Sequence, residues 1–238
     1  MDTLNIDTVR LKVRPAYALG TVTVIIPAFN EVGRVGAVVR AACQVEFVNH
    51  VIVVDDGSTD GTAEEALNAA CNGVQVQALR HPVNQGKGQA LLSGVKAARD
   101  PVLVFLDADL LHLNPDHIRD LAEPVLNNQA AMSIGIFEHG RWITDLSHRM
   151  TPWLTGQRCV VAELMNDLPM DAAAGYGFET ALTLQARRRS WPVQSVPMMG
   201  VSHPTQLRRS GWGLVTFKVK MLAHILRAWV TLRKQNRS

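Results

Sequence analysis

Short apolar runs alternate along the first half of the chain with segments whose apolar residues recur at helical spacing. Three such runs are Thr21–Ile26, Val51–Val54 and Val102–Leu106, and the third strand along the chain, Val74–Leu79, instead alternates apolar with polar residues. Apolar strands separated by helices are typical of a parallel sheet that is covered on both faces. The pattern therefore predicts an α/β protein with a mostly parallel sheet and helices on both faces.

Further elements follow from the same spacing. The intervening helices are expected at 31–47, 60–70 and 86–98. Beyond Leu110 the pattern predicts a helix at Pro115–Asn127, a strand at Ala131–Phe137, helices around Pro152–Leu164 and Tyr176–Arg188, and a long terminal helix at Gly211–Arg233. The polar residues of that last helix step by four and three positions, so they form one stripe of an amphipathic helix.

Carboxylates stand directly after two of the predicted strands. Asp55 and Asp56 follow the second strand, and Asp107 and Asp109 follow the fourth. In open α/β sheets, ligands bind beyond the carboxyl ends of the strands. The placement of these carboxylates predicts a binding site at that edge of the sheet.

Composition narrows the class of protein. Of the 238 residues, 47% are hydrophobic and 19% are charged, and this composition excludes a predominantly disordered chain. The three cysteines are too few and too scattered for a disulfide framework or a structural zinc site. The amino terminus has no continuous apolar run typical of a secretory signal, and no uncharged run is long enough to span a bilayer. We expect a cytoplasmic protein.

The net charge of +3 conceals an uneven distribution. All 21 acidic residues precede residue 180, and the remaining 59 residues carry eleven lysines and arginines. A basic segment of this kind favours an anionic partner, and its amphipathic helix is also typical of a protein that lies on the inner face of a membrane. Few aromatic residues interleave the basic ones, which argues against nucleic acid.

Four local sequences occur in a distinctive order: Pro27-Ala-Phe-Asn-Glu31, Asp55-Asp-Gly-Ser-Thr-Asp-Gly-Thr62, Asn84-Gln-Gly-Lys-Gly88 and Asp107-Ala-Asp109. In this order and spacing the set resembles family 2 glycosyltransferases, which have the GT-A fold. The resemblance covers residues 20–110 strongly and 130–205 more weakly. It implies a GT-A domain over 1–205, with the nucleotide in 20–110 and the acceptor in 111–205, followed by a basic amphipathic helix at 206–238.

The resemblance also implies roles on the donor side. Asp109 would bind Mg²⁺ or Mn²⁺ directly, and Asp107 would lie nearer the ribose or just behind the direct ligands of the metal. Ala108 between them would let the backbone approach the ligand. A hard cation prefers such oxygen ligands and bridges them to phosphate. The donor site would also hold Pro27, Ala28, Asn30, Glu31 and Asp56 around the nucleoside, and Lys87 near the diphosphate. Structural alternatives remain open for several of these positions. Asp107 and Asp109 also suit solvated aspartates that cap a loop, and Glu31 also suits the start of a helix. The segment after Asp56 suits a turn and a helix cap, through Ser58, Thr59 and Asp60.

On the acceptor side the resemblance is looser. Glu179, in Gly175-Tyr176-Gly-Phe-Glu179, would orient or deprotonate the acceptor, with Asp171 as a weaker alternative and Tyr176 as an acceptor contact. His203 resembles a late histidine that serves as a third metal ligand in some GT-A enzymes. Arg158 would bind an acceptor phosphate or pair with a carboxylate on the surface.

The function implied is metal-dependent transfer of a sugar from a UDP- or GDP-linked donor to a polyprenyl phosphate, a lipid or a small phosphorylated acceptor. A sugar-phosphate nucleotidylyltransferase is the alternative enzyme, although Pro27–Glu31 stands where those enzymes have a glycine-rich loop with an arginine. A non-catalytic subunit that binds nucleotide sugars is the other alternative. The sequence leaves open whether the chain forms a homodimer.

Overall fold

A computed structural model describes residues 20–71, 73–138, 156–166, 168 and 177–204. In these residues one sheet of seven strands runs in the order β3-β2-β1-β4-β6-β5-β7. Its strands are β1 (Val22–Ala28), β2 (Val48–Asp55), β3 (Gln75–Arg80), β4 (Val102–Phe105), β5 (Met132–Glu138), β6 (Arg158–Val161) and β7 (Val193–Met199). Only β6 runs against its neighbours β4 and β5. The prediction of a mostly parallel α/β sheet is confirmed.

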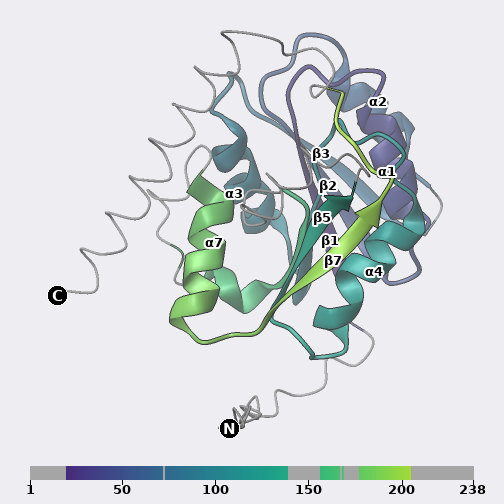
Figure 1. The fold of residues 1–238 in the computed structure, drawn as a ribbon. Coiled ribbons are helices and arrows are strands. Elements are labelled where there is room, and N and C mark those ends of the chain that lie inside the picture. Colours follow the sequence, from purple (N-terminus) through teal and green to yellow (C-terminus); the bar gives the residue numbers. More distant parts are fainter. Residues whose placement is uncertain (1–19, 72, 139–155, 167, 169–176, 205–238) are drawn as a thin grey trace, which may run out of the picture.

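Helices cover both faces of this sheet. Figure 1 shows α1, α2 and α4 on one face, and α3 and α7 pack together on the other. The helices are α1 (Val35–Cys43), α2 (Thr62–Asn68), α3 (Lys87–Ala97), α4 (Pro115–Leu126) and α7 (Gly177–Arg188), with a short 3₁₀ helix at Ala162–Met165. None of the described helices is long and apolar enough to cross a membrane.

Apolar side chains on both faces of the central strands hold these layers together. In β1, Val24 and Ile25 point to opposite faces and both are completely buried. Val35, Val38 and Val39 of α1 pack into the same core, which explains the helical spacing of apolar residues in this segment. The helix begins at Val35 rather than at Glu31, because Gly33 has a φ of 82° and interrupts helical geometry before it.

Two predictions about the second half of the chain need correction. The helix expected around Pro152–Leu164 is wrong over its described part, because Arg158–Val161 form strand β6 between β4 and β5. Its run of Cys159, Val160 and Val161 is fully buried on both faces, and such a short apolar run does not distinguish a strand from a helix. Strand β7 was not expected, since Val193–Met199 has exposed residues and a proline. The terminal helix at 206–238 lies outside the described residues.

A polar cluster ties the strands together at the amino end of the sheet. The carboxylate of Asp100 accepts a hydrogen bond from Thr23 Oγ1 at 2.6 Å and lies 2.8 Å from His50 Nδ1. Burial raises the pKa of Asp100, but the hydrogen bonds from Thr23, Thr21 and His50 lower it by more, so the pKa of Asp100 lies below its ordinary value. The carboxylate is therefore ionised in the folded protein at neutral pH.

Candidate active site

Three potential metal ligands converge at the carboxyl end of the central strands. Asp107 and Asp109 follow β4, and His203 follows β7, the strand at the far edge of the sheet. An antiparallel bridge between Leu111 and Ser202 brings the two segments together. One ligand atom from each residue lies within 4.8 Å of the others. The late histidine predicted from the sequence therefore joins the two carboxylates.

The histidine already contacts both carboxylates. His203 Nδ1 lies 2.8 Å from Asp109 Oδ1, and His203 Nε2 lies 3.7 Å from Asp107 Oδ2. Burial lowers the pKa of His203, but the hydrogen bond to Asp109 and the charge of Asp107 raise it by more, so the pKa lies above its usual value. The excess negative charge at this point attracts a proton to His203, and it would attract a cation in the same way.

The donor set suits a divalent cation. Two carboxylate oxygens and one imidazole nitrogen within 4.8 Å of one another can reach a single ion, because such ligands bind at about 2.0–2.3 Å. Carboxylates suit Mg²⁺ and Mn²⁺, and imidazole is a ligand for first-row transition metals. Asp107, Asp109 and His203 therefore fit Mg²⁺ or Mn²⁺, as the sequence predicts.

Lys87 borders this cluster from the first turn of α3. Its Nζ lies 2.7 Å from Asp107 Oδ1 and 3.0 Å from Glu179 Oε1. Burial lowers the pKa of Lys87, but the charges of Asp107 and Glu179 raise it well above its usual value. Burial likewise raises the pKa of Asp107, and the charges of Lys87 and His203 bring it below the ordinary value. Lys87 therefore adds a fixed positive charge beside the candidate cation site.

Glu179 has a different setting from the one the sequence predicts. It lies in the first turn of α7, only 6% of its surface is exposed, and it is paired with Lys87. A general base must reach the proton that it removes, and a buried carboxylate bound to an ammonium is poorly placed for that. The pairing therefore suits Glu179 to hold Lys87 in position. Its role as the base that deprotonates the acceptor stays a prediction.

Two residues that the sequence reasoning did not select pack directly on Asp107. Gln157 is fully buried, and its Nε2 donates to Asp107 Oδ2 at 3.0 Å. Gly156 lies so close that a Cβ atom there would be 2.7 Å from both Asp107 oxygens and 2.8 Å from Lys87 Nζ. A glycine and a polar residue just before the apolar run Cys159–Val161 are a usable signal for a loop that enters a strand, and the helix expected around Pro152–Leu164 conflicts with it.

Asp56 serves the loop that leads into α3. Its Oδ1 lies 2.7 Å from His81 Nδ1 and accepts from the Gln85 amide at 2.9 Å, and its Oδ2 accepts from the Gly86 amide at 2.7 Å. Its exposed fraction is 3%. The contact with the nucleoside stays a prediction, while these bonds make Asp56 an anchor for the loop that carries Lys87.

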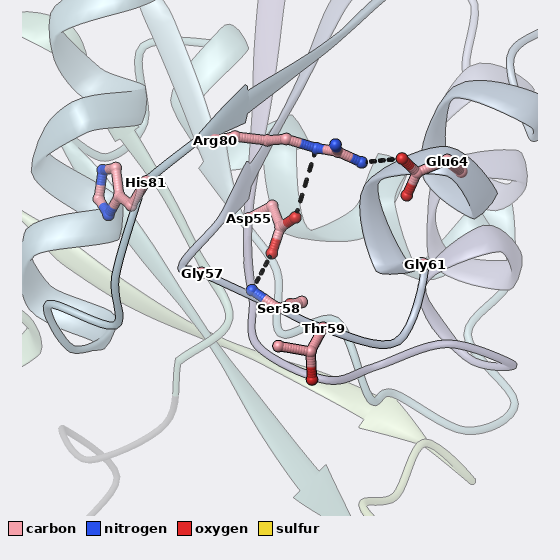
Figure 2. A pocket seen from close by; sticks show the side chains of 8 residues that line it. All are labelled: Asp55, Gly57, Ser58, Thr59, Gly61, Glu64, Arg80 and His81. Atoms are coloured by element: carbon pink, nitrogen blue, oxygen red, sulfur yellow. Dashed lines mark hydrogen bonds and ion pairs between the residues drawn. The ribbon is translucent and has the colours of Figure 1, made fainter.

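A pocket of about 310 Å³ opens beside this segment (Figure 2). Figure 2 shows Asp55 between the Arg80 guanidinium and the backbone of Ser58, with the Arg80 side chain reaching on toward Glu64. Gly57 turns the chain here with a φ of 80°, and a Cβ atom on it would lie 2.8 Å from the backbone of Asn84. The pocket therefore has a carboxylate, hydroxyl groups and a guanidinium along one wall.

The end of β1 and the loop after it contain the other predicted donor residues. Ala28 is buried and accepts a hydrogen bond from the Asp56 amide at 2.8 Å, and Pro27 precedes it in β1. Asn30 has a φ of 54°, and its side chain accepts from the Thr59 amide at 3.1 Å. Burial raises the pKa of Glu31, although its ion pair with Arg34 opposes the rise. These residues lie at the same edge as the cluster.

Side chains from the segment 58–65 hold this loop in place. The amides of Asn30, Glu31 and Val32 donate to Ser58 Oγ, Thr62 Oγ1 and Asp60 Oδ2 at 2.9, 2.9 and 3.2 Å. The amides of Gly33 and Gly36 donate to the carboxylate of Glu65. Glu65 of α2 thus accepts from one amide of the first turn of α1 and from the Gly33 amide just before that helix, which ties the loop to α2.

Arg158 is the clearest error among the predicted site residues. It is fully buried, and its Nη1 donates to Thr183 Oγ1 at 2.9 Å. Burial lowers the pKa of Arg158 to about 10, against the raising effect of Glu179. The alternative of pairing on the surface is therefore wrong, while the contact with an acceptor phosphate stays a prediction that the burial of the guanidinium disfavours. Asp171 and Tyr176 lie outside the described residues.

Known proteins resemble the chain over most of its length. The family model described as glycosyl transferase family 2 matches residues 23–186. The glucosyl-3-phosphoglycerate synthase of Mycobacterium tuberculosis is 28% identical over 213 residues, which cover 72% of this chain and 65% of that protein. The undecaprenyl-phosphate mannosyltransferase of Micrococcus luteus is 25% identical over 217 residues, covering 82% and 89%. The chain thus spans slightly less than two thirds of the length of the mycobacterial synthase.

Solved structures of the mycobacterial synthase have the same fold. One is a complex with Mn²⁺, UDP-glucose and phosphoglyceric acid, with a TM-score of 0.70 and 26% identity over 90% of this chain and 81% of that one. A second, with Mg²⁺ and UDP, has a TM-score of 0.70 and 26% identity, covering 90% and 80%. The similarity extends beyond the motifs to the arrangement of the sheet.

Proposed function

Because the chain belongs to glycosyl transferase family 2, we propose that it transfers a sugar from a nucleotide diphosphate sugar to a phosphorylated acceptor. The observation that carries this proposal is the cluster of Asp107, Asp109 and His203 beside Lys87 at the carboxyl edge of the sheet. A bound Mg²⁺ or Mn²⁺ would neutralise the diphosphate and make it a better leaving group. The three ligands would hold that cation.

The protein's own groups complete the donor side. Lys87 presents a charge that Asp107 and Glu179 keep protonated, and it stabilises the negative charge that develops as the bond to the sugar breaks. Asp56 fixes the loop before Lys87, and the bonds from 58–65 fix the loop that carries Glu31. These groups are held in place before the donor binds, so little reorganisation is needed during transfer.

The sheet order suggests how the donor lies. The pocket lined by Asp55 and Arg80 follows β2 and β3, and the cation cluster follows β4. Three strand spacings of about 4.8 Å separate β3 from β4, which is about 14 Å and suits an extended nucleoside diphosphate. We place the base in the pocket and the diphosphate at Lys87 and the cluster. The hydroxyl groups and the guanidinium of the pocket can hydrogen-bond a base such as uracil.

The acceptor class rests on the relatives. The M. tuberculosis synthase is seen with phosphoglyceric acid, and the M. luteus relative is named for undecaprenyl phosphate. Both acceptors carry phosphate, in agreement with the basic character of residues 180–238. A phosphate oxygen is already a nucleophile, whereas a hydroxyl acceptor requires a base, so the acceptor decides whether Glu179 or Asp171 has a chemical role.

A donor and acceptor screen tests the proposal. The protein is incubated with UDP- and GDP-sugars, with Mn²⁺ or Mg²⁺, and with 3-phosphoglycerate or a polyprenyl phosphate, and released nucleotide is measured. We expect UDP or GDP to be released with one acceptor class, and Asp109→Ala to remove the release. A parallel incubation with UTP or GTP and a sugar 1-phosphate tests the alternative enzyme, and pyrophosphate released there would favour a nucleotidylyltransferase. UDP binding without release under every condition would favour a non-catalytic subunit.

Two finer points are part of the proposal. If the acceptor is a lipid phosphate, the segment 206–238 lies on an anionic membrane surface, and removing it lowers binding to anionic liposomes while leaving release from a soluble donor intact. Equal liposome binding by the shortened protein would contradict a membrane role.

Sedimentation at micromolar concentration decides whether the chain is a homodimer.

A further inference from the structure

Gln157 occupies an unusual position for a polar side chain. It lies immediately before β6, at the junction between the core and the cation cluster, and none of its surface is exposed. Its Nε2 donates to Asp107 Oδ2 at 3.0 Å, but its Oε1 has no partner among the described residues. A buried carbonyl without a hydrogen bond lowers stability, and most proteins avoid it.

The orientation of this amide is determined by its neighbour. Turning the amide over would place Oε1 against the ionised carboxylate of Asp107, where two acceptors repel each other. Nε2 must therefore face Asp107, and Oε1 must face the protein interior. Within the part of the chain that the structure describes, the bond to Asp107 thus leaves the Gln157 carbonyl without a hydrogen bond.

That bond helps to determine how Asp107 is presented. Lys87 holds Oδ1 at 2.7 Å, and Gln157 holds Oδ2, the oxygen that lies 3.7 Å from His203 Nε2. The two bonds fix the rotation of the carboxylate from both ends. Because the amide is neutral, it orients Oδ2 without cancelling the negative charge that a cation needs, whereas a second lysine there would compete with the cation.

We infer that Gln157 is a positioning residue for the cation site, acting by orienting Asp107 Oδ2 toward the ion. The inference rests on the proposed function, since it requires a cation at Asp107, Asp109 and His203. Groups that orient metal ligands in this way typically contribute 10- to 100-fold to metal affinity or activity. Their contribution to folding need not be favourable, because here the unpaired Oε1 opposes the stabilising bond from Nε2 to Asp107.

Gln157→Met separates the two effects. Methionine has nearly the same shape but cannot donate to Asp107, and it removes the unpaired carbonyl. We expect the melting temperature to be unchanged or higher and the affinity for Mn²⁺ to fall at least tenfold. A residue with a purely structural role would lower stability and leave affinity intact. Mn²⁺ is titrated with free ion measured by EPR, first alone and then with UDP at a fixed concentration.

Gln185→Met is the matched control. Gln185 is also buried and also has an unpaired Oε1, but it lies in α7. We expect it to leave Mn²⁺ affinity at the wild-type value. Gln157→Asn is the second variant if the methionine protein does not fold, because it keeps a buried amide one methylene too short to reach Asp107, and it is expected to lose the same affinity.

The outcomes separate this inference from the proposed function. Suppose that the unmodified protein binds Mn²⁺ and that Gln157→Met or Gln157→Asn binds it equally well. That result overturns the role of Gln157 and leaves the proposed function intact. An equal loss in Gln185→Met also overturns it, since the effect would then be general. Absence of Mn²⁺ binding by the wild-type protein, with and without UDP, refutes the cation site itself and both proposals.

Discussion

The substitution Gly156→Ala tests how closely the backbone at residue 156 packs on the cation cluster. Its φ lies outside the left-handed region, so alanine suits the backbone there, and the only obstacle is space. The added Cβ would lie 2.7 Å from Oδ1 and Oδ2 of Asp107 and 2.8 Å from Lys87 Nζ. Ordinary contact begins at 3.4 Å, so these atoms must move by about 0.7 Å.

A displacement of that size has large consequences in this place. The ion pair between Lys87 and Asp107 spans 2.7 Å, and Asp107 is also held by Gln157, so the carboxylate has little freedom to yield. Overpacking of this kind costs about 1–3 kcal/mol. Metal ligands must lie within about 0.2 Å of their ideal distance, so most of the cost is expected to appear in cation binding.

We therefore expect Gly156→Ala to lower Mn²⁺ affinity and nucleotide release by about 10- to 100-fold, since 1.4 kcal/mol corresponds to a factor of ten. The Mn²⁺ titration described above measures the first quantity, and the release assay measures the second. Melting followed by circular dichroism measures the part of the overpacking cost that destabilises the fold, and we expect the melting temperature to fall by a few degrees.

Gly94→Ala is the control, because its Cβ would meet Ile25 in the core of the sheet, away from the cluster. It should lower the melting temperature and leave the Mn²⁺ affinity of the folded protein unchanged. Wild-type Mn²⁺ affinity in folded Gly156→Ala would refute the reasoning, since it would mean that Asp107 and Lys87 can move apart without effect on the cation.

The remaining predictions use the same assays or simple unfolding. Asp109→Ala should remove Mn²⁺-dependent binding of the donor in calorimetry, and unchanged release would exclude Asp109 as a ligand. Lys87→Met should lower nucleotide release at least 100-fold with a smaller effect on Mn²⁺ affinity, whereas an equal fall in both would indicate that Lys87 acts by shaping the cluster. Because the pKa of Asp100 is lower in the folded than in the unfolded protein, its ionised carboxylate stabilises the fold at pH values above the unfolded pKa of about 3.9. Asp100→Asn should therefore lower the unfolding free energy by about 1–3 kcal/mol at pH 7 in urea titrations. The difference from the wild type should shrink as the pH falls below about 4, and a difference independent of pH would contradict it.

The sequence alone was sufficient for the donor half of the sheet. The strands β1, β2 and β4 contain unbroken apolar runs, β3 alternates apolar with polar residues, and aspartates stand at the carboxyl ends of β2 and β4. Hydrophobic pattern and position therefore predict both the parallel sheet and its edge. Asp107 and Asp109 are two residues apart after one strand, which places them together without any knowledge of distant contacts. The local sequence was therefore sufficient to predict the two carboxylates of the site that follow a single strand, Asp107 and Asp109.

The tertiary structure decided everything that depends on segments far apart in the chain. His203 reaches Asp109 only because β7 pairs with β5 and a bridge joins 111 to 202. Gln157 and Gly156 reach Asp107 because β6 inserts beside β4, where a helix was expected, and the same insertion buries Arg158. Whether a carboxylate binds a ligand or anchors a loop, as with Asp56 and Glu65, depends on which amides the fold brings to it. Charge and periodicity identify the groups that can do chemistry, but hydrogen-bond partners are assigned by packing, which a single sequence does not display.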